Sequence, residues 1–138
     1  MAEVFAGFVI GYALSLAISP LAAWIVISSN DRSGVAQRLA PPGTNFVALS
    51  MVLHFTAMLM LTAIGIVLGM ALGGIEDRRP AGGIGSPNVI YTAIVVALTA
   101  VIFLPTVVLP AARRYVLPFA LVFAVMFGWA MPWLATLG

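Results

Sequence analysis

The chain has 138 residues, of which 63% are hydrophobic and only 7% are charged, and its formal net charge is +2. A soluble domain needs a polar surface that this composition does not supply, so the lipid bilayer is the expected surrounding. The absence of cysteine excludes disulfides, thiol catalysis and thiolate metal sites. The six basic residues are all loop arginines, and they indicate no nucleic-acid partner.

Four long apolar segments contain no Asp, Glu, Lys or Arg, and each exceeds the roughly 20 residues that a helix needs to cross a bilayer. The segments are residues 4–28, 46–72, 88–109 and 115–137. They predict an all-α membrane protein, a single four-transmembrane-helix bundle over residues 1–138 with antiparallel neighbours. Because the link between the last two segments is very short, these two helices are expected to form a tight antiparallel hairpin.

The distribution of arginines predicts how the chain is oriented in a cell membrane. The first and third loops carry four arginines, which are Arg32, Arg38, Arg113 and Arg114, whereas the second loop carries two. Since positively charged loops tend to stay in the cytoplasm, the first and third loops are predicted to be cytoplasmic and both termini to lie outside. A dual-topology protein would show a similarly small difference, so that alternative stays open.

Small residues recur four positions apart in the segments, and this spacing places them on one face of a helix. Lipid tails are as apolar as leucine, so close contact between helix backbones at small residues is what favours association in a bilayer. The pattern is typical either of contacts within one chain or of an interface with a second copy or another membrane subunit. The candidate packing residues are Gly7, Gly11, Ser15, Gly65, Gly69, Gly73, Ala120, Ala124 and Gly128, and Ala93 and Ala97 continue the pattern in the third segment.

An aromatic stripe accompanies the small residues of the last segment. Its members are Tyr115, Phe119, Phe123 and Phe127. The stripe indicates either a surface that faces lipid or a neighbouring helix, or a groove for a quinone, a carotenoid or another flat apolar ligand.

His54 is the only histidine, and it is the one ionisable side chain inside the segments that is a candidate for a functional site. Ser50 lies one turn before it, and Gly65 lies within about 20° of it on the helical circumference. An ionisable residue at membrane depth is a functional candidate. Three interpretations are open: a hydrogen bond to a neighbouring helix, proton or ion transfer, and haem ligation together with Met51, Met58 or the same histidine of a second copy.

Prolines are predicted to kink three of the helices, because proline lacks the amide hydrogen that continues the backbone ladder. They are Pro20, Pro105 and Pro132. The hydroxyls of Ser15 and Ser19 lie near the first of these sites, and that of Thr106 lies near the second.

These features favour a non-catalytic subunit or homo-oligomeric scaffold of a membrane complex. A small oligomeric transporter or channel is the alternative, and a membrane subunit that binds haem or quinone is the third possibility. The sequence predicts no catalytic residue, no metal site and no obligatory cofactor.

Overall fold

A computed structural model describes residues 1–28, 41, 43–75, 88–108 and 113–137. Within these ranges every regular element is a helix. Four helical stretches have the length and composition of membrane spans, and they are Ala2–Ile25, Phe46–Gly74, Val89–Val108 and Arg113–Leu137. The predicted all-α class is therefore confirmed, with four spans close to the predicted ones. Most of the loop residues on which the predicted orientation rests lie outside the described residues.

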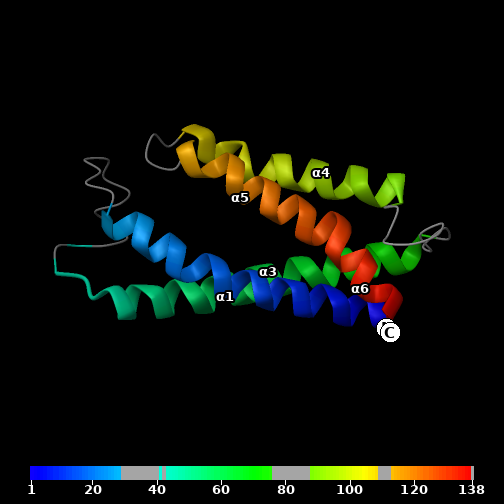
Figure 1. Ribbon diagram of the computed structural model, residues 1–138, viewed down its shortest axis with the longest axis horizontal. Helices are drawn as coiled ribbons and strands as arrows, with labels where there is room; N and C mark the ends of the chain where they lie inside the picture. Colours follow the sequence, from blue (N-terminus) through cyan, green and yellow to red (C-terminus); the bar gives the residue numbers. More distant parts are fainter. Residues whose placement is uncertain (29–40, 42, 76–87, 109–112, 138) are drawn as a thin grey trace.

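The first two spans are α1 (Ala2–Ser28) and α3 (Phe46–Gly74), which lie side by side in Figure 1. Asn45 caps the start of α3, where its side-chain oxygen accepts a hydrogen bond of 2.8 Å from the amide of Val47. Such a cap satisfies one of the amide donors that every helix leaves free in its first turn. Pro20 lies inside α1, which remains a single helix.

Glycines decide how closely α1 and α3 approach. A methyl group built on Gly65 would overlap the backbone carbonyl of Gly7, and one built on Gly69 would overlap the backbone of α1 around Glu3. Gly11 meets the backbone of α3 at Leu61 in the same way. The two helices are therefore in backbone contact, which only residues without a Cβ allow.

The third span consists of α4 (Val89–Phe103) followed by η1 (Pro105–Val108), a short 3-10 helix. Asn88 caps α4 by accepting hydrogen bonds from two amides of its first turn. Pro105 comes after Leu104, the C-cap residue of α4, and its ring removes an amide donor, so the helix tightens instead of continuing. The predicted kink at Pro105 thus takes the form of a change from an α-helix to a 3-10 turn.

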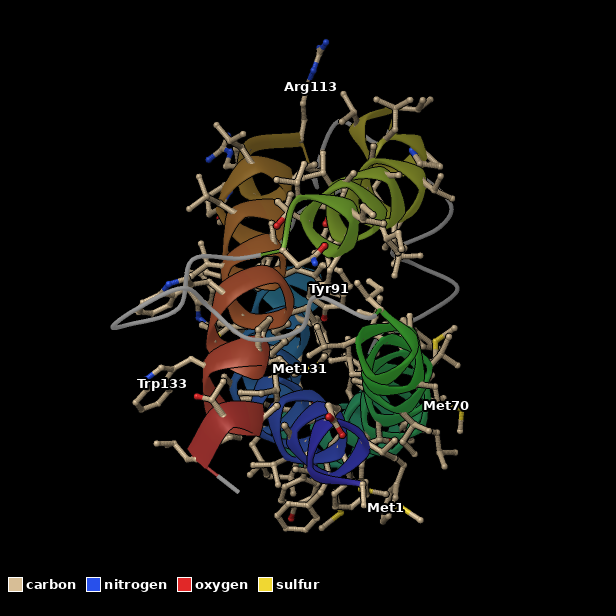
Figure 2. All side chains as sticks on the ribbon, turned by 90° about the vertical axis from the view of Figure 1, so that its right-hand side faces the viewer. Met1, Met70, Tyr91, Arg113, Met131 and Trp133 are labelled. Atoms are coloured by element: carbon tan, nitrogen blue, oxygen red, sulfur yellow. The ribbon has the colours of Figure 1, made fainter. Side chains whose placement is uncertain are left out.

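The fourth span runs through α5 (Arg113–Val125), the π-helix η2 (Met126–Ala130) and α6 (Met131–Leu137). It starts beside η1 and crosses so that α6 lies against α1 (Figure 1). The main core forms where these elements meet, and Figure 2 shows Tyr91 and Met131 inside it while Met70 and Trp133 project outward. The buried core residues are Ala6, Ile10, Leu14, Leu68, Leu72, Tyr91, Val95, Phe123, Phe127 and Met131.

Candidate functional site

His54 has a polar partner on the neighbouring helix. The Oγ atom of Ser19 on α1 lies 3.5 Å from Nδ1 of His54 on α3. The hydroxyl of Ser19 donates its own proton to the backbone carbonyl of Ser15. Because a hydroxyl has only one proton, this bond leaves Ser19 Oγ as an acceptor toward His54, and we expect Nδ1 of His54 to carry the hydrogen. In the neutral ring this leaves the lone pair on Nε2.

The predicted companion of His54 was Ser50, which the structure places half-buried one turn earlier on α3. Ser19 is the hydroxyl that the fold brings to the imidazole, and it is buried. Ser15 is also buried, and its hydroxyl donates to the carbonyl of Tyr12 at 2.7 Å. The sequence held one indication of Ser19, which is its place directly before Pro20 in the small-residue stripe of α1.

The small-residue candidates occupy different surroundings. Gly7, Gly11, Gly65 and Gly69 are buried in the α1–α3 contact and are already covered by a helix of the same chain. Gly73 differs from them, because a methyl group at this position would meet no atom within 4 Å.

The small residues of the last span are less tightly enclosed. Gly128 faces the side chain of Val95 at 3.5 Å, measured from the position of a built Cβ. Ala120 and Ala124 are half-buried on α5. An interface between copies stays a prediction for the whole set.

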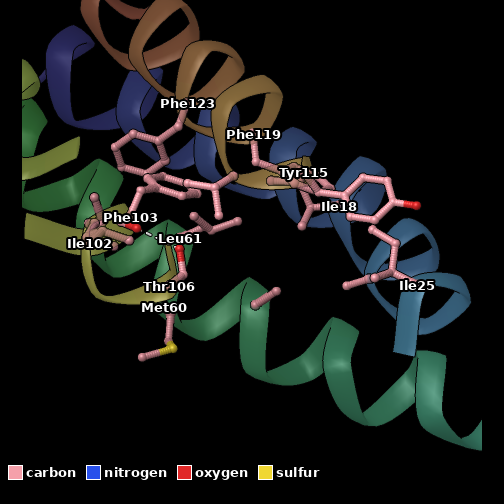
Figure 3. Close-up of a pocket in the computed structure, with 14 residues that line it drawn as sticks. Ile18, Ile25, Met60, Leu61, Ile102, Phe103, Thr106, Tyr115, Phe119 and Phe123 are labelled. Atoms are coloured by element: carbon pink, nitrogen blue, oxygen red, sulfur yellow. Dashed lines mark hydrogen bonds between the residues drawn. The ribbon is translucent and has the colours of Figure 1, made fainter. Parts of the chain in front are cut away.

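A pocket of about 460 Å³ lies between the α1–α3 pair and the η1–α5 region (Figure 3). Its lining comes from all four spans, so it exists only when the α1–α3 pair packs against the last two spans. The lining residues are Ile18, Ala22, Ile25, Ala57, Met60, Leu61, Ile64, Ile102, Phe103, Thr106, Tyr115, Val116, Phe119 and Phe123.

The aromatic stripe of the last span forms one wall of this pocket. Tyr115, Phe119 and Phe123 line it, and the ring of Phe123 meets that of Phe103 edge-on with 5.7 Å between the ring centroids. Phe127 departs from the stripe, because it is fully buried behind Phe123 with their centroids 4.8 Å apart. Three of the four aromatic residues therefore share the groove that their spacing suggested.

The pocket offers little polar chemistry. The hydroxyl of Thr106 donates to the carbonyl of Phe103 at 2.6 Å, the bond drawn in Figure 3, and is thereby occupied. The hydroxyl of Tyr115 lies at the end of the pocket near Ile25 and points away from the other lining side chains (Figure 3). In the part of the chain that the structure describes, His, Asp and Glu side chains form no group of three that could hold a metal ion.

Three comparisons with known proteins complete the description of the site. No protein-family model, curated protein or solved structure matches the chain. The functional conclusion therefore rests on three features of the molecule itself: the pocket, the His54–Ser19 pair and the exposed faces of the spans.

Proposed function

We propose that this chain is a non-catalytic integral membrane subunit that assembles with further copies of itself through α4. The observation that carries the proposal is a row of exposed alanines on the side of α4 that faces away from the rest of the chain.

The geometry of α4 separates two faces. At about 100° per residue, Tyr91, Val95, Leu98 and Ile102 lie within an arc of about 60°. Tyr91 and Val95 are buried there, while Leu98 and Ile102 are half-buried and pack on the core. This face makes the core contact of α4, and Phe103 at the end of the helix adds the contact with Phe123.

The opposite face carries the alanines. Ala93, Ala97 and Ala100 lie within another arc of about 60°, roughly 180° from the buried residues. All three are exposed. In a bilayer, where leucine gains little by leaving lipid, a row of small residues favours close approach of another helix. The glycines of α1 and α3 use the same four-residue spacing for their own contact.

In this proposal residues 1–138 form one domain in the lipid bilayer of the cell membrane. The four spans form a bundle in which the last two are an antiparallel hairpin. The contact between Phe103 and Phe123 and the short link between these spans support the hairpin. The first and third loops face the cytoplasm and both termini lie outside, in line with the exposed arginines Arg113 and Arg114 at the start of α5.

Native mass spectrometry of protein extracted gently from its membrane tests the assembly. The natural chain is expected to be a homo-oligomer, and the variant with Ala93→Leu and Ala97→Leu is expected to dissociate. Ala63→Leu is the matched control, because Ala63 is an exposed alanine of α3. An oligomer that survives the α4 substitutions, or a monomeric natural chain, would contradict the proposal.

The same preparation separates the alternatives. Co-purifying foreign subunits would indicate a mixed complex, and a haem or quinone absorption band would indicate a cofactor-binding subunit. Solute flux into liposomes that is lost in His54→Ala would favour a transporter or channel instead.

Orientation is testable because the chain contains no cysteine. A single cysteine introduced in place of Thr44 or Thr136 can be labelled by a membrane-impermeant maleimide in intact cells. Labelling at Thr136→Cys but not at Thr44→Cys is expected, and the reverse result would show the opposite orientation.

A further inference from the structure

We propose that the pocket between the α1–α3 pair and the η1–α5 region binds a hydrocarbon chain of an anionic membrane lipid, whose headgroup contacts Arg113 and Arg114. This ligand site is separate from the proposed assembly through α4, because the exposed alanines lie on the opposite face of α4 from Ile102, which lines the pocket.

The size of the pocket suits a ligand. Its volume of about 460 Å³ falls in the range of roughly 300–1,000 Å³ that small-molecule sites occupy. Ala22 on α1 and Ala57 on α3 provide part of this space, because their side chains are short at positions where the facing wall carries Phe119 and Phe123. A long aliphatic chain would lie between the aromatic wall and the α1–α3 pair.

The chemistry of the lining selects the buried part of the ligand. Twelve of the fourteen lining residues have wholly apolar side chains, and the exceptions are Thr106 and Tyr115. The hydroxyl of Thr106 already donates to the carbonyl of Phe103. A polar ligand group would lose its hydrogen bonds on entering this space, and that desolvation is costly. The part of the ligand inside the pocket is therefore hydrocarbon.

The charge at the mouth selects the headgroup. Tyr115 lines the end of the pocket, and the two residues before it, Arg113 and Arg114, are exposed in the first turn of α5. Figure 2 shows the Arg113 side chain extending outward from α5, on the side away from α1 and α3. Basic residues at the membrane surface attract anionic lipids.

Acidic residues do not offset this charge in the described part of the chain. Its one carboxylate side chain belongs to Glu3, at the start of α1, which lies at the other end of the molecule from the start of α5 (Figure 1). Glu3 pairs with the N-terminal ammonium at 3.0 Å. Among the described residues, the charges next to the Tyr115 end of the pocket are therefore those of the two arginines, and an anionic headgroup complements them better than a zwitterionic one.

Native mass spectrometry with defined lipids tests the site. The protein is incubated with phosphatidylglycerol or phosphatidylcholine that carry identical acyl chains, and the retained lipid is counted. We expect phosphatidylglycerol to be retained about tenfold more tightly. Equal retention of the two lipids by the natural chain would overturn the headgroup assignment and the proposal with it.

A substitution that fills the pocket with a larger side chain is the second test of the lipid site. Ala57→Phe places a ring in the cavity and is expected to reduce retention of phosphatidylglycerol about tenfold or more. Ala63→Phe adds the same ring on an exposed position of the same helix and should leave retention unchanged. If Ala57→Phe fails to give the helical circular dichroism of the natural chain, Ala22→Phe fills the pocket from α1. Undiminished retention in a folded pocket variant would overturn the proposal.

Replacing both arginines tests the headgroup contact separately from binding of the hydrocarbon chain. The variant with Arg113→Gln and Arg114→Gln should retain the two lipids equally, at the level of phosphatidylcholine in the natural chain. A preference for phosphatidylglycerol that persists in this variant would contradict the headgroup contact. A neutral quinone or carotenoid that co-purifies and is lost in Ala57→Phe would also replace the lipid as the ligand. The subunit number read from the same spectra reports on assembly through α4 independently.

Discussion

The phenol of Tyr91 on α4 donates a hydrogen bond of 2.8 Å to the backbone carbonyl of Phe127 in the π-helix, and both residues are fully buried. This bond compensates for a break in the helical ladder. The amide of Met131, which would bond Phe127 in an α-helix, bonds the carbonyl of Met126 instead. The next possible donor is at Pro132, and proline has no amide hydrogen. Tyr91 therefore supplies the donor that the fourth span lacks.

Tyr91→Phe is expected to destabilise the protein. The substitution keeps the ring in the core but leaves the carbonyl of Phe127 without its partner, at a cost of about 1–3 kcal/mol. Unfolding in mixed micelles with increasing denaturing detergent, followed by circular dichroism, measures the change. Tyr12→Phe is the control, because Tyr12 is exposed on α1. Equal stability of Tyr91→Phe and Tyr12→Phe would argue against a stabilising role for the bond.

Pro132→Ala should make the Tyr91 hydroxyl less important. The new amide at residue 132 allows the carbonyl of Phe127 to find a backbone donor whether the span keeps its π-turn or returns to an α-helix. The cost of Tyr91→Phe is therefore expected to be smaller in the Pro132→Ala background, with a coupling of about 0.5–3 kcal/mol in a double-mutant cycle. Strictly additive effects would show that Pro132 does not create the need for Tyr91.

Replacement by alanine is expected to change the stability of the protein differently at two glycines of α3. At Gly65 the new methyl group overlaps the carbonyl of Gly7, so α1 and α3 must separate. Forced overpacking of this kind costs about 1–3 kcal/mol. At Gly73 the methyl group meets nothing within 4 Å, and the better helix propensity of alanine makes the change neutral or stabilising by up to about 1 kcal/mol. Equal effects in the same unfolding assay would contradict the glycine contact.

The Nδ1 atom of His54 is expected to carry a hydrogen that Ser19 accepts. Nitrogen-15 NMR of the protein labelled at histidine distinguishes the two tautomers, and the single histidine makes the assignment unambiguous. Ser19→Ala removes the acceptor and should change the Nδ1 resonance, with a loss of stability of about 0.6 kcal/mol, the average for polar contacts between membrane helices. Ser50→Ala is the control and should leave the resonance in place. A hydrogen found on Nε2 instead would contradict the arrangement of Ser15, Ser19 and His54.

Much of the architecture follows from the sequence alone. The bilayer has a fixed thickness and water is absent from its core, so long segments without charges must be helices that span it. The four spans, the disturbance at Pro105 and the shared face of Tyr115, Phe119 and Phe123 were therefore all predictable. Each depends on residues close together in the chain.

The tertiary structure decided which faces meet. Helical spacing shows that Gly7 and Gly11, or Gly65 and Gly69, share a face, but the partner of that face depends on how the spans pack. The same limit applies to His54, because its contact with Ser19 joins two different helices.

The last span also combines a feature that the local sequence predicts with a contact that only the tertiary structure shows. Its sequence reveals that Pro132 lacks an amide hydrogen, while the donor that replaces it is Tyr91, 41 residues earlier in the chain. Similarly, Phe127 has the spacing of a pocket residue but lies in the core instead, within the π-turn that contacts α1. Local sequence determined the helices and their faces, and long-range packing selected the contacts that each face makes.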